Sequence, residues 1–252
     1  MDKEIFEKLN YLENLKNLKG YHFTTNFIPI KDGNIKKILQ YKKLNHFGIS
    51  IYGSDKETFM QFTQSTESSY NKLIKNLNDL NKEIIFNNSI EITIWQRSEK
   101  NFKLEKSESE LSNVIKKLIK NPNISYAYNE EYNNWGGMIK KKDVADLNID
   151  LVEGKTFKKG PCSLIFSRNI IGADGKVNAC ACRDANFELT IGNLKEQRLS
   201  EILSKKNEKY MKIINDQNKG NFHPVCKNCD FYVSIYDKRH GSGYSKEKSK
   251  KI

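Results

Sequence analysis

The chain lacks any apolar run close to the roughly 20 residues that a membrane-spanning helix needs. Its first residues, MDKEIFEKLN, mix charged with apolar side chains and therefore do not form the continuous apolar core of a secretory signal. A P-loop, a G-x-G-x-x-G stretch and a Ser/His/Asp arrangement are also missing, which removes common signals for phosphate, dinucleotide and serine-hydrolase sites. These absences predict a soluble, cytoplasmic protein that does not contact a membrane.

No cysteine precedes Cys162, and all five cysteines lie between Cys162 and Cys229. An odd number of cysteines, in a chain without a secretory signal, argues against a disulfide framework and favours a metal or redox role. The alternative is a set of buried, unligated thiols, because free cysteine packs as a small apolar residue. Their clustering around one turn and one short loop makes a metal site the better interpretation.

The chain is basic, with 43 Lys and Arg against 31 Asp and Glu and a net charge of +12. A basic balance is compatible with nucleic-acid binding. Here, however, the lysines are scattered through every expected helix and accompany many Asn and Ile residues, which indicates compositional bias and solvated helix faces. We therefore expect no nucleic-acid partner. Residues 236–252 are basic and are expected to form a disordered tail.

Helical and strand patterns alternate along the first half of the chain, joined by short links. Because a helix that connects two strands returns the chain to the same end of the sheet, these strands are expected to be parallel. The sequence therefore predicts an α/β fold with about four parallel strands. The expected strands are 21–26, 47–53, 89–95 and 123–128, and the expected helical stretches are 2–18, 34–44, 57–62, 68–82 and 107–120.

Beyond residue 160 the pattern changes to a β-hairpin followed by a helix and a cysteine-bearing loop. Asp174-Gly175 between two apolar stretches is a hairpin signal, and we expect Cys162 and Cys180 to lie on its two strands. Helical periodicity follows over 198–217. The C-x₂-C pair Cys226 and Cys229 has a spacing that lets two thiolates point at one metal centre.

Two ligand sets are compatible with these cysteines, because zinc and iron–sulfur clusters both favour thiolates. A zinc ribbon would pair Cys180 and Cys182 with the C-x₂-C loop and leave Cys162 unused. A cubane cluster is wider and makes better use of the separated pair Cys162 and Cys180, which leaves Cys182 as the spare thiol. The spacing favours the cluster, with zinc as the alternative.

The stretches GPCSLIF, DGKVNACACRD, IGNL, SEIL and CKNCDFY within 160–232 resemble the auxiliary-cluster domain, of SPASM or twitch type, of radical S-adenosylmethionine (SAM) enzymes. The resemblance implies one auxiliary [4Fe–4S] cluster with Cys162, Cys180, Cys226 and Cys229 as ligands and Cys182 as alternate ligand. No cysteine follows Cys229, as in the shorter twitch form.

Upstream, HFTTN, FGISIYG, ITIWQ and NNWGGMI resemble later strands of the family's partial (βα)₆ barrel and the segment that leaves it. This implies a barrel remnant of about four strands followed by a small α+β domain with a β-hairpin. The expected organisation is a partial barrel over 1–137, a linker over 138–160, a cluster domain over 161–235 and the tail over 236–252.

The family's C-x₃-C-x₂-C loop, whose cluster binds and cleaves SAM, is absent from this sequence. The resemblance therefore implies that the chain does not cleave SAM by itself, and it leaves open whether the chain is an enzyme. SAM and a second [4Fe–4S] cluster are expected only if the missing N-terminal part is supplied. The chain is then the C-terminal part of a radical SAM enzyme, a split partner that a second chain completes, or a non-catalytic iron–sulfur protein.

The substrate of a complete parent enzyme is expected to be a peptide, a sugar or a small metabolite. Ser50 matches a position that contacts SAM in the family, and an ordinary buried serine is the alternative. Asn26 and Arg97 follow or end strands, where barrel sites collect. The alternative hypothesis belongs to a different functional class: a zinc or iron–sulfur Cys₄ module that docks a partner without catalysis.

Overall fold

The computed structural model describes residues 4–84, 90–152 and 156–236. Its contacts divide the chain into two compact units. The first unit comprises Met1–Glu131 with Asp146–Asp150, and the second comprises Tyr132–Ala145 with Leu151–Ile252. Residues 237–252 of the predicted basic tail lie outside the described residues. Among the described helices, none combines the length and apolar character needed to cross a membrane.

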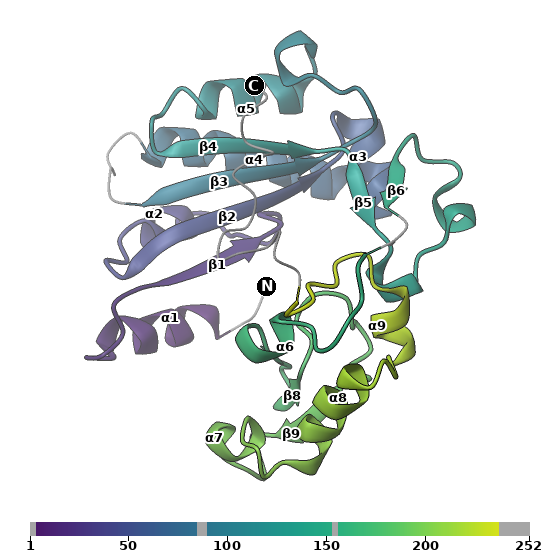
Figure 1. Cartoon of the computed structure of the whole chain (residues 1–252). Helices are drawn as coiled ribbons and strands as arrows, with labels where there is room; N and C mark the ends of the chain where they lie inside the picture. The colour runs from purple at the N-terminus through teal and green to yellow at the C-terminus, as the bar shows by residue number, and fades with distance from the viewer. Residues whose placement is uncertain (1–3, 85–89, 153–155, 237–252) are drawn as a thin grey trace. The chain divides into compact units, whose positions relative to one another are not determined.

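The first unit is built on one sheet whose four strands are all parallel, in the order β1-β2-β3-β4 (Figure 1). Helices connect the successive strands, so the parallel sheet predicted from the alternating pattern is confirmed. The strands are β1 (Tyr21–Thr25), β2 (Leu44–Tyr52), β3 (Glu91–Arg97) and β4 (Ile124–Asn129). The helices are α1 (Ile5–Asn14), α2 (Asn34–Ile38), α3 (Lys56–Thr63), α4 (Glu67–Glu83), η2 (Leu104–Lys106) and α5 (Glu110–Leu118).

One face of this sheet packs against the helices and forms the core of the unit. In β3 the buried residues Ile92, Ile94 and Gln96 alternate with more exposed neighbours, because successive side chains of a strand point to opposite faces. The buried set of β2 joins the same cluster as apolar side chains of all five α-helices. The opposite face carries polar and aromatic side chains, among them Trp95, which is 38% exposed.

Several predicted helices differ from the structure in their bounds: the helix expected over 2–18 ends at Asn14, and the one expected over 107–120 runs from Glu110 to Leu118. The helix expected over 34–44 is α2, which ends at Ile38, and β2 begins at Leu44, whose partner in the sheet is Tyr21. Pairing with β1 buries Leu44 and so outweighs the local helical pattern. The helix expected over 198–217 is interrupted, because the side chain of Asn207 accepts hydrogen bonds from the first N–H groups of a new helix, α8 (Glu208–Asn218).

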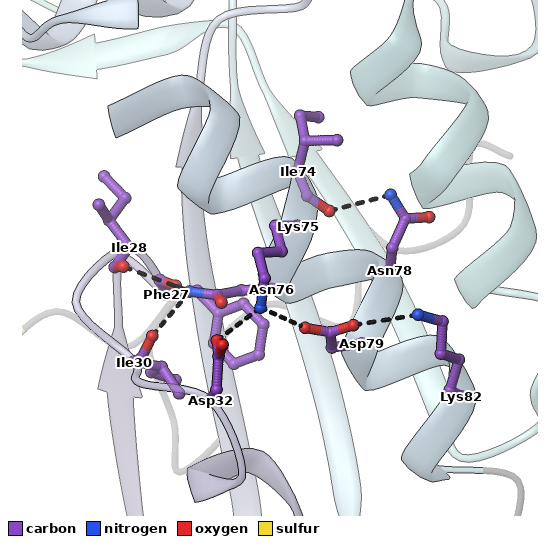
Figure 2. A network of polar contacts seen from close by, with 10 residues as sticks. All are labelled: Phe27, Ile28, Ile30, Asp32, Ile74, Lys75, Asn76, Asn78, Asp79 and Lys82. Atoms are coloured by element: carbon purple, nitrogen blue, oxygen red, sulfur yellow. Dashed lines mark hydrogen bonds and ion pairs between the residues drawn. The ribbon is translucent and has the colours of Figure 1, made fainter. Parts of the chain in front are cut away.

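A buried asparagine anchors the loop after β1 to α4, as Figure 2 shows. The side-chain amide of Asn76 donates to the carbonyls of Phe27, Ile28 and Ile30 at 2.8, 3.2 and 3.3 Å. At the surface of the same helix, Lys75 forms ion pairs with Asp32 and Asp79. The loop carbonyls are therefore satisfied by the helix, while the N–H of Phe27 donates to Thr25 Oγ1 of β1 at 3.1 Å. Phe27 lies in the core with a positive φ of 63°.

The second unit contains a small antiparallel sheet in the order β7-β8-β9. Gly175 occupies its tight turn with φ +87°, a conformation that glycine adopts without strain, and the predicted hairpin at Asp174-Gly175 is confirmed. The fold class predicted from the sequence is thus confirmed. The strands of this sheet are β7 (Ile170–Ile171), β8 (Lys176–Asn178) and β9 (Thr190–Asn193). The other elements of the unit are η3 (Trp135–Gly137), η4 (Lys141–Val144), α6 (Leu164–Ser167), α7 (Leu199–Ile202) and α9 (Pro224–Asn228), and, except for their first residues, β5 (Glu131–Asn133) and β6 (Asp150–Val152).

Candidate metal centre

Cys162 and Cys180 line the same cavity, although neither lies on a strand of the hairpin, which is where the sequence placed them. Cys162 precedes α6 and forms an isolated antiparallel bridge with Ser234, near the end of the described chain. Cys180 lies two residues after β8. The residues after Cys162 turn into a short helix before the hairpin begins, so the hairpin is shorter than its cysteine spacing implies.

The C-x₂-C pair is carried by the short helix α9. Cys226 lies within the helix, and Cys229 follows as its C-cap and donates its N–H to the Cys226 carbonyl at 3.4 Å. Pro224 occupies the start, where the missing N–H is not needed. The ring nitrogen Nδ1 of His223 accepts the N–H of Val225 at 3.4 Å. His223 therefore caps the helix that carries Cys226.

All five thiols line one cavity of about 20 Å³ within the second unit. Its other lining residues supply no carboxylate and no imidazole: Leu164, Ile165, Arg183, Val225, Phe231 and Tyr232. In the described part of the chain, no three His, Cys, Asp or Glu side chains meet at a point that holds a single metal ion.

Hydrogen-bond donors already face three of the sulfur atoms. The N–H of Cys182 donates to Cys180 Sγ at 3.4 Å, and the N–H of Phe231 donates to Cys229 Sγ at 3.2 Å. The side-chain amide of Gln217 donates to Cys226 Sγ at 3.3 Å. Donors to sulfur stabilise negative charge on thiolates and on clusters. These three donors would therefore stabilise thiolates in the cavity.

Burial is the main reason that the pKa values of Cys226 and Cys229 rise to about 12. Burial also raises the pKa of Cys162 and of Cys182. The neighbouring Cys180 adds to the rise in all four, because a second thiolate in the cavity repels the first. These four thiols therefore keep their protons at neutral pH in the absence of a metal, and a metal that binds them must displace the protons.

A buried ion pair borders the cavity. Arg183 Nε lies 2.5 Å from Asp230 Oδ1, and the two side chains are only 16% and 2% exposed. The guanidinium stacks over the Phe231 ring, 5.0 Å from its centroid, and donates to the Cys182 carbonyl at 2.9 Å. The other Asp230 oxygen accepts the N–H of Asn134 at 3.1 Å, which ties the segment before η3 to the cysteine loop.

Our sequence analysis missed Arg183, Asp230 and Gln217. The first two directly follow cysteines of the motif, in CRD and NCD, and this adjacency was a usable signal. Gln217 gives no such signal, because it lies in a polar helix nine residues before Cys226.

The candidate residues of the first unit lie on or near the carboxyl ends of its strands. Ser50 is half-buried on the sheet face opposite the helices, where its register partner is Trp95. The guanidinium of Arg97 donates to the Tyr52 hydroxyl at 3.2 Å. Asn26 is exposed, and its side chain accepts the N–H of Ile28 at 3.3 Å, which is a local turn contact. None of these three residues is among those that line the cysteine cavity.

Residues 162–230 match the family model of SPASM, an iron–sulfur cluster-binding domain. No curated protein matches the chain. One solved structure, "Native anSMEcpe with bound AdoMet and Cp18Cys peptide", is similar over 90% of this chain and 69% of its own, with 17% sequence identity and a TM-score of 0.46. The match to SPASM confirms the resemblance seen in the cysteine segment.

Proposed function

We propose that the second unit binds one [4Fe–4S] cluster through Cys162, Cys180, Cys226 and Cys229. The observation that carries this proposal is the cavity itself, in which thiols are the only metal-binding side chains. Thiolates are the usual ligands of iron–sulfur clusters. A cluster bound there would supply one-electron transfer or a contact for a substrate.

The protein residues around the thiols have separate tasks in this proposal. Arg183 attracts negative charge on Cys229, the paired carboxylate of Asp230 opposes this effect, and the ion pair keeps the guanidinium in place. Ile165 and Tyr232 are buried and limit the access of water to the centre. The hydroxyl of Tyr232 donates to the Gly160 carbonyl, which fixes its ring. Burial and charge of this kind set the potential of a cluster.

Anaerobic reconstitution with iron and sulfide tests the proposal. We expect four irons and four sulfides per chain and a brown chromophore, because a cubane holds four of each. Four single substitutions are each expected to lower the iron content: Cys162→Ser, Cys180→Ser, Cys226→Ser and Cys229→Ser. Cys182→Ser is the matched control and should leave the iron content unchanged. Colourless, iron-free protein after reconstitution refutes the proposal.

Zinc is the second candidate, because Cys182 lines the same cavity and could complete a set with Cys180, Cys226 and Cys229. A Cys₄ zinc module would serve docking rather than catalysis. The two candidates differ in the thiol they leave out. One colourless zinc per chain that is lost in Cys182→Ser and kept in Cys162→Ser supports the zinc module.

We further propose that these 252 residues work with a radical SAM barrel but do not cleave SAM alone, because no C-x₃-C-x₂-C loop is among them. In the described residues β1 pairs with β2 only, so its other edge is open to a strand of a second chain or of a preceding segment. Ser50 would then contact SAM. Dithionite and SAM should give no 5′-deoxyadenosine with this chain, and its formation would refute this step.

The substrate of such a completed enzyme is proposed to be a peptide, a sugar or a small metabolite. Free thiols and an oxygen-sensitive cluster require a reducing compartment, so we propose the cytoplasm as the location. Fractionation of cells that produce the chain checks the location, and thiol labelling before lysis checks that the cysteines are reduced there.

A further inference from the structure

Gln217 joins the two halves of the cysteine set. Its side chain is 1% exposed and lies near the end of α8. The side-chain oxygen accepts the N–H of Cys162 at 2.9 Å, and the side-chain nitrogen donates to Cys226 Sγ at 3.3 Å. One amide thus contacts a residue from the hairpin side of the cavity and one from the C-x₂-C side.

The orientation of this amide follows from its partners. A backbone N–H can only donate, so the group that faces Cys162 must be the amide oxygen. The NH₂ group then points at Cys226, where sulfur is an acceptor. A glutamate at this position could satisfy Cys162 equally well but would present an oxygen to the sulfur.

The helix that carries Gln217 is anchored independently of it. The hydroxyl of Tyr210, on the same helix, donates to the Ile165 carbonyl at 2.8 Å and is buried. At its beginning Asn207 donates to the carbonyls of Ile191 and Ile202 at 2.8 and 2.7 Å. These contacts fix the position of α8 and, with it, the position of the Gln217 side chain.

We infer that Gln217 is a positioning residue of the cluster site, which holds Cys162 and Cys226 in register and tunes the cluster through its donor to Cys226 Sγ. This inference rests on the proposed function. A hydrogen bond to a ligating sulfur stabilises the added electron of the reduced cluster and so raises its reduction potential. An exchange of the donor for a carboxylate should lower the potential, because it removes the hydrogen bond and adds a negative charge.

The test compares Gln217→Glu and Gln217→Leu with the unsubstituted chain after anaerobic reconstitution. Iron content and the midpoint potential, followed by visible absorbance during a redox titration, are measured for each. Asn207→Ala is the matched control, because it weakens the same helix without a contact to sulfur. We expect a more negative midpoint in both Gln217 variants, with the larger shift in Gln217→Glu, and the midpoint of the control unchanged.

The iron content and the midpoint potential together distinguish a role of Gln217 toward the cluster from a role in helix stability alone. A more negative midpoint in the Gln217 variants, or loss of iron from them while Asn207→Ala stays loaded, supports the role of Gln217, whereas a more positive midpoint contradicts it. Full iron with an unchanged midpoint in both variants overturns it, and so does equal loss of iron in all three, which indicates helix stability alone. An unsubstituted chain that takes up no iron refutes the proposed function itself, and with it any role of Gln217 toward a cluster.

Discussion

Asp230 holds Arg183 in a buried ion pair beside the cysteines, with 2.5 Å between Nε and Oδ1. Removal of one partner leaves a charge buried without compensation, which typically costs about 3–5 kcal/mol. We expect Asp230→Ala to lower the free energy of unfolding of the second unit by this order. Urea unfolding measures it, with Trp135 as the reporter in a Trp95→Phe background, because the chain has two Trp residues.

The exposed pair of Lys176 and Asp174 provides the control for that prediction. Both side chains are 52% exposed, and exposed pairs contribute no more than about 1 kcal/mol. Lys176→Ala breaks this pair and leaves the hydrogen bond from the Lys176 N–H to the Asp174 carboxylate in place, so it should change the unfolding transition far less than Asp230→Ala does. Equal losses from both substitutions would show that burial of the Arg183 pair adds nothing to stability.

Asn76→Ala should destabilise the first unit. The substitution leaves the carbonyls of Phe27, Ile28 and Ile30 without their shared donor, and unsatisfied buried groups cost about 1–3 kcal/mol. Asn78→Ala on the same helix is the control, because Asn78 donates only within its helix, to the Ile74 carbonyl. Trp95 fluorescence in a Trp135→Phe background reports the transition. A larger effect of Asn78→Ala would contradict the anchoring role of Asn76.

Gly136→Ala should weaken the second unit more than Gly220→Ala does. Both glycines have positive φ, +68° and +79°, so alanine at either position costs about 1–2 kcal/mol of backbone strain. At Gly136 the added methyl would also lie 2.6 Å from the Arg183 carbonyl, whereas nothing lies within 4 Å of it at Gly220. The denaturant midpoints of the two variants are compared. Similar midpoints would mean that the backbone around Gly136 and Arg183 shifts to admit the methyl group without a loss of stability.

The first unit should lose stability above pH 10. Burial raises the pKa values of Tyr70 and Tyr128 to about 12, from 10.0 in an unfolded chain. The raised native pKa means that the unfolded chain releases these protons first, so the stabilising contribution is complete below pH 10 and is lost as pH rises toward 12. Tyr70→Phe should flatten this alkaline loss in urea unfolding at pH 8 to 11. If the free energy of unfolding of Tyr70→Phe falls with pH as steeply as that of the unsubstituted chain, a group other than Tyr70 causes the alkaline loss.

Much of the first unit could be predicted because its strands and helices differ in local pattern. Continuous apolar segments such as FGISI predicted strands, and the helices between them required those strands to be parallel. The boundaries at Leu44 and Asn207 could not be predicted. At Leu44 the pairing of two strands decides where the helix ends, and at Asn207 contacts to Ile191 and Ile202 decide where one begins.

The sequence by itself determined that Cys226 and Cys229 lie close together, because the C-x₂-C spacing imposes their proximity over four residues, and the clustering of all five cysteines indicated a metal site. Only the tertiary structure decided what surrounds them. Gln217 contacts Cys162 across 55 positions, and Arg183 contacts Asp230 across 47. Such contacts depend on how helix α8 and the cysteine loop pack, and packing between distant segments leaves no periodic pattern in the amino-acid order.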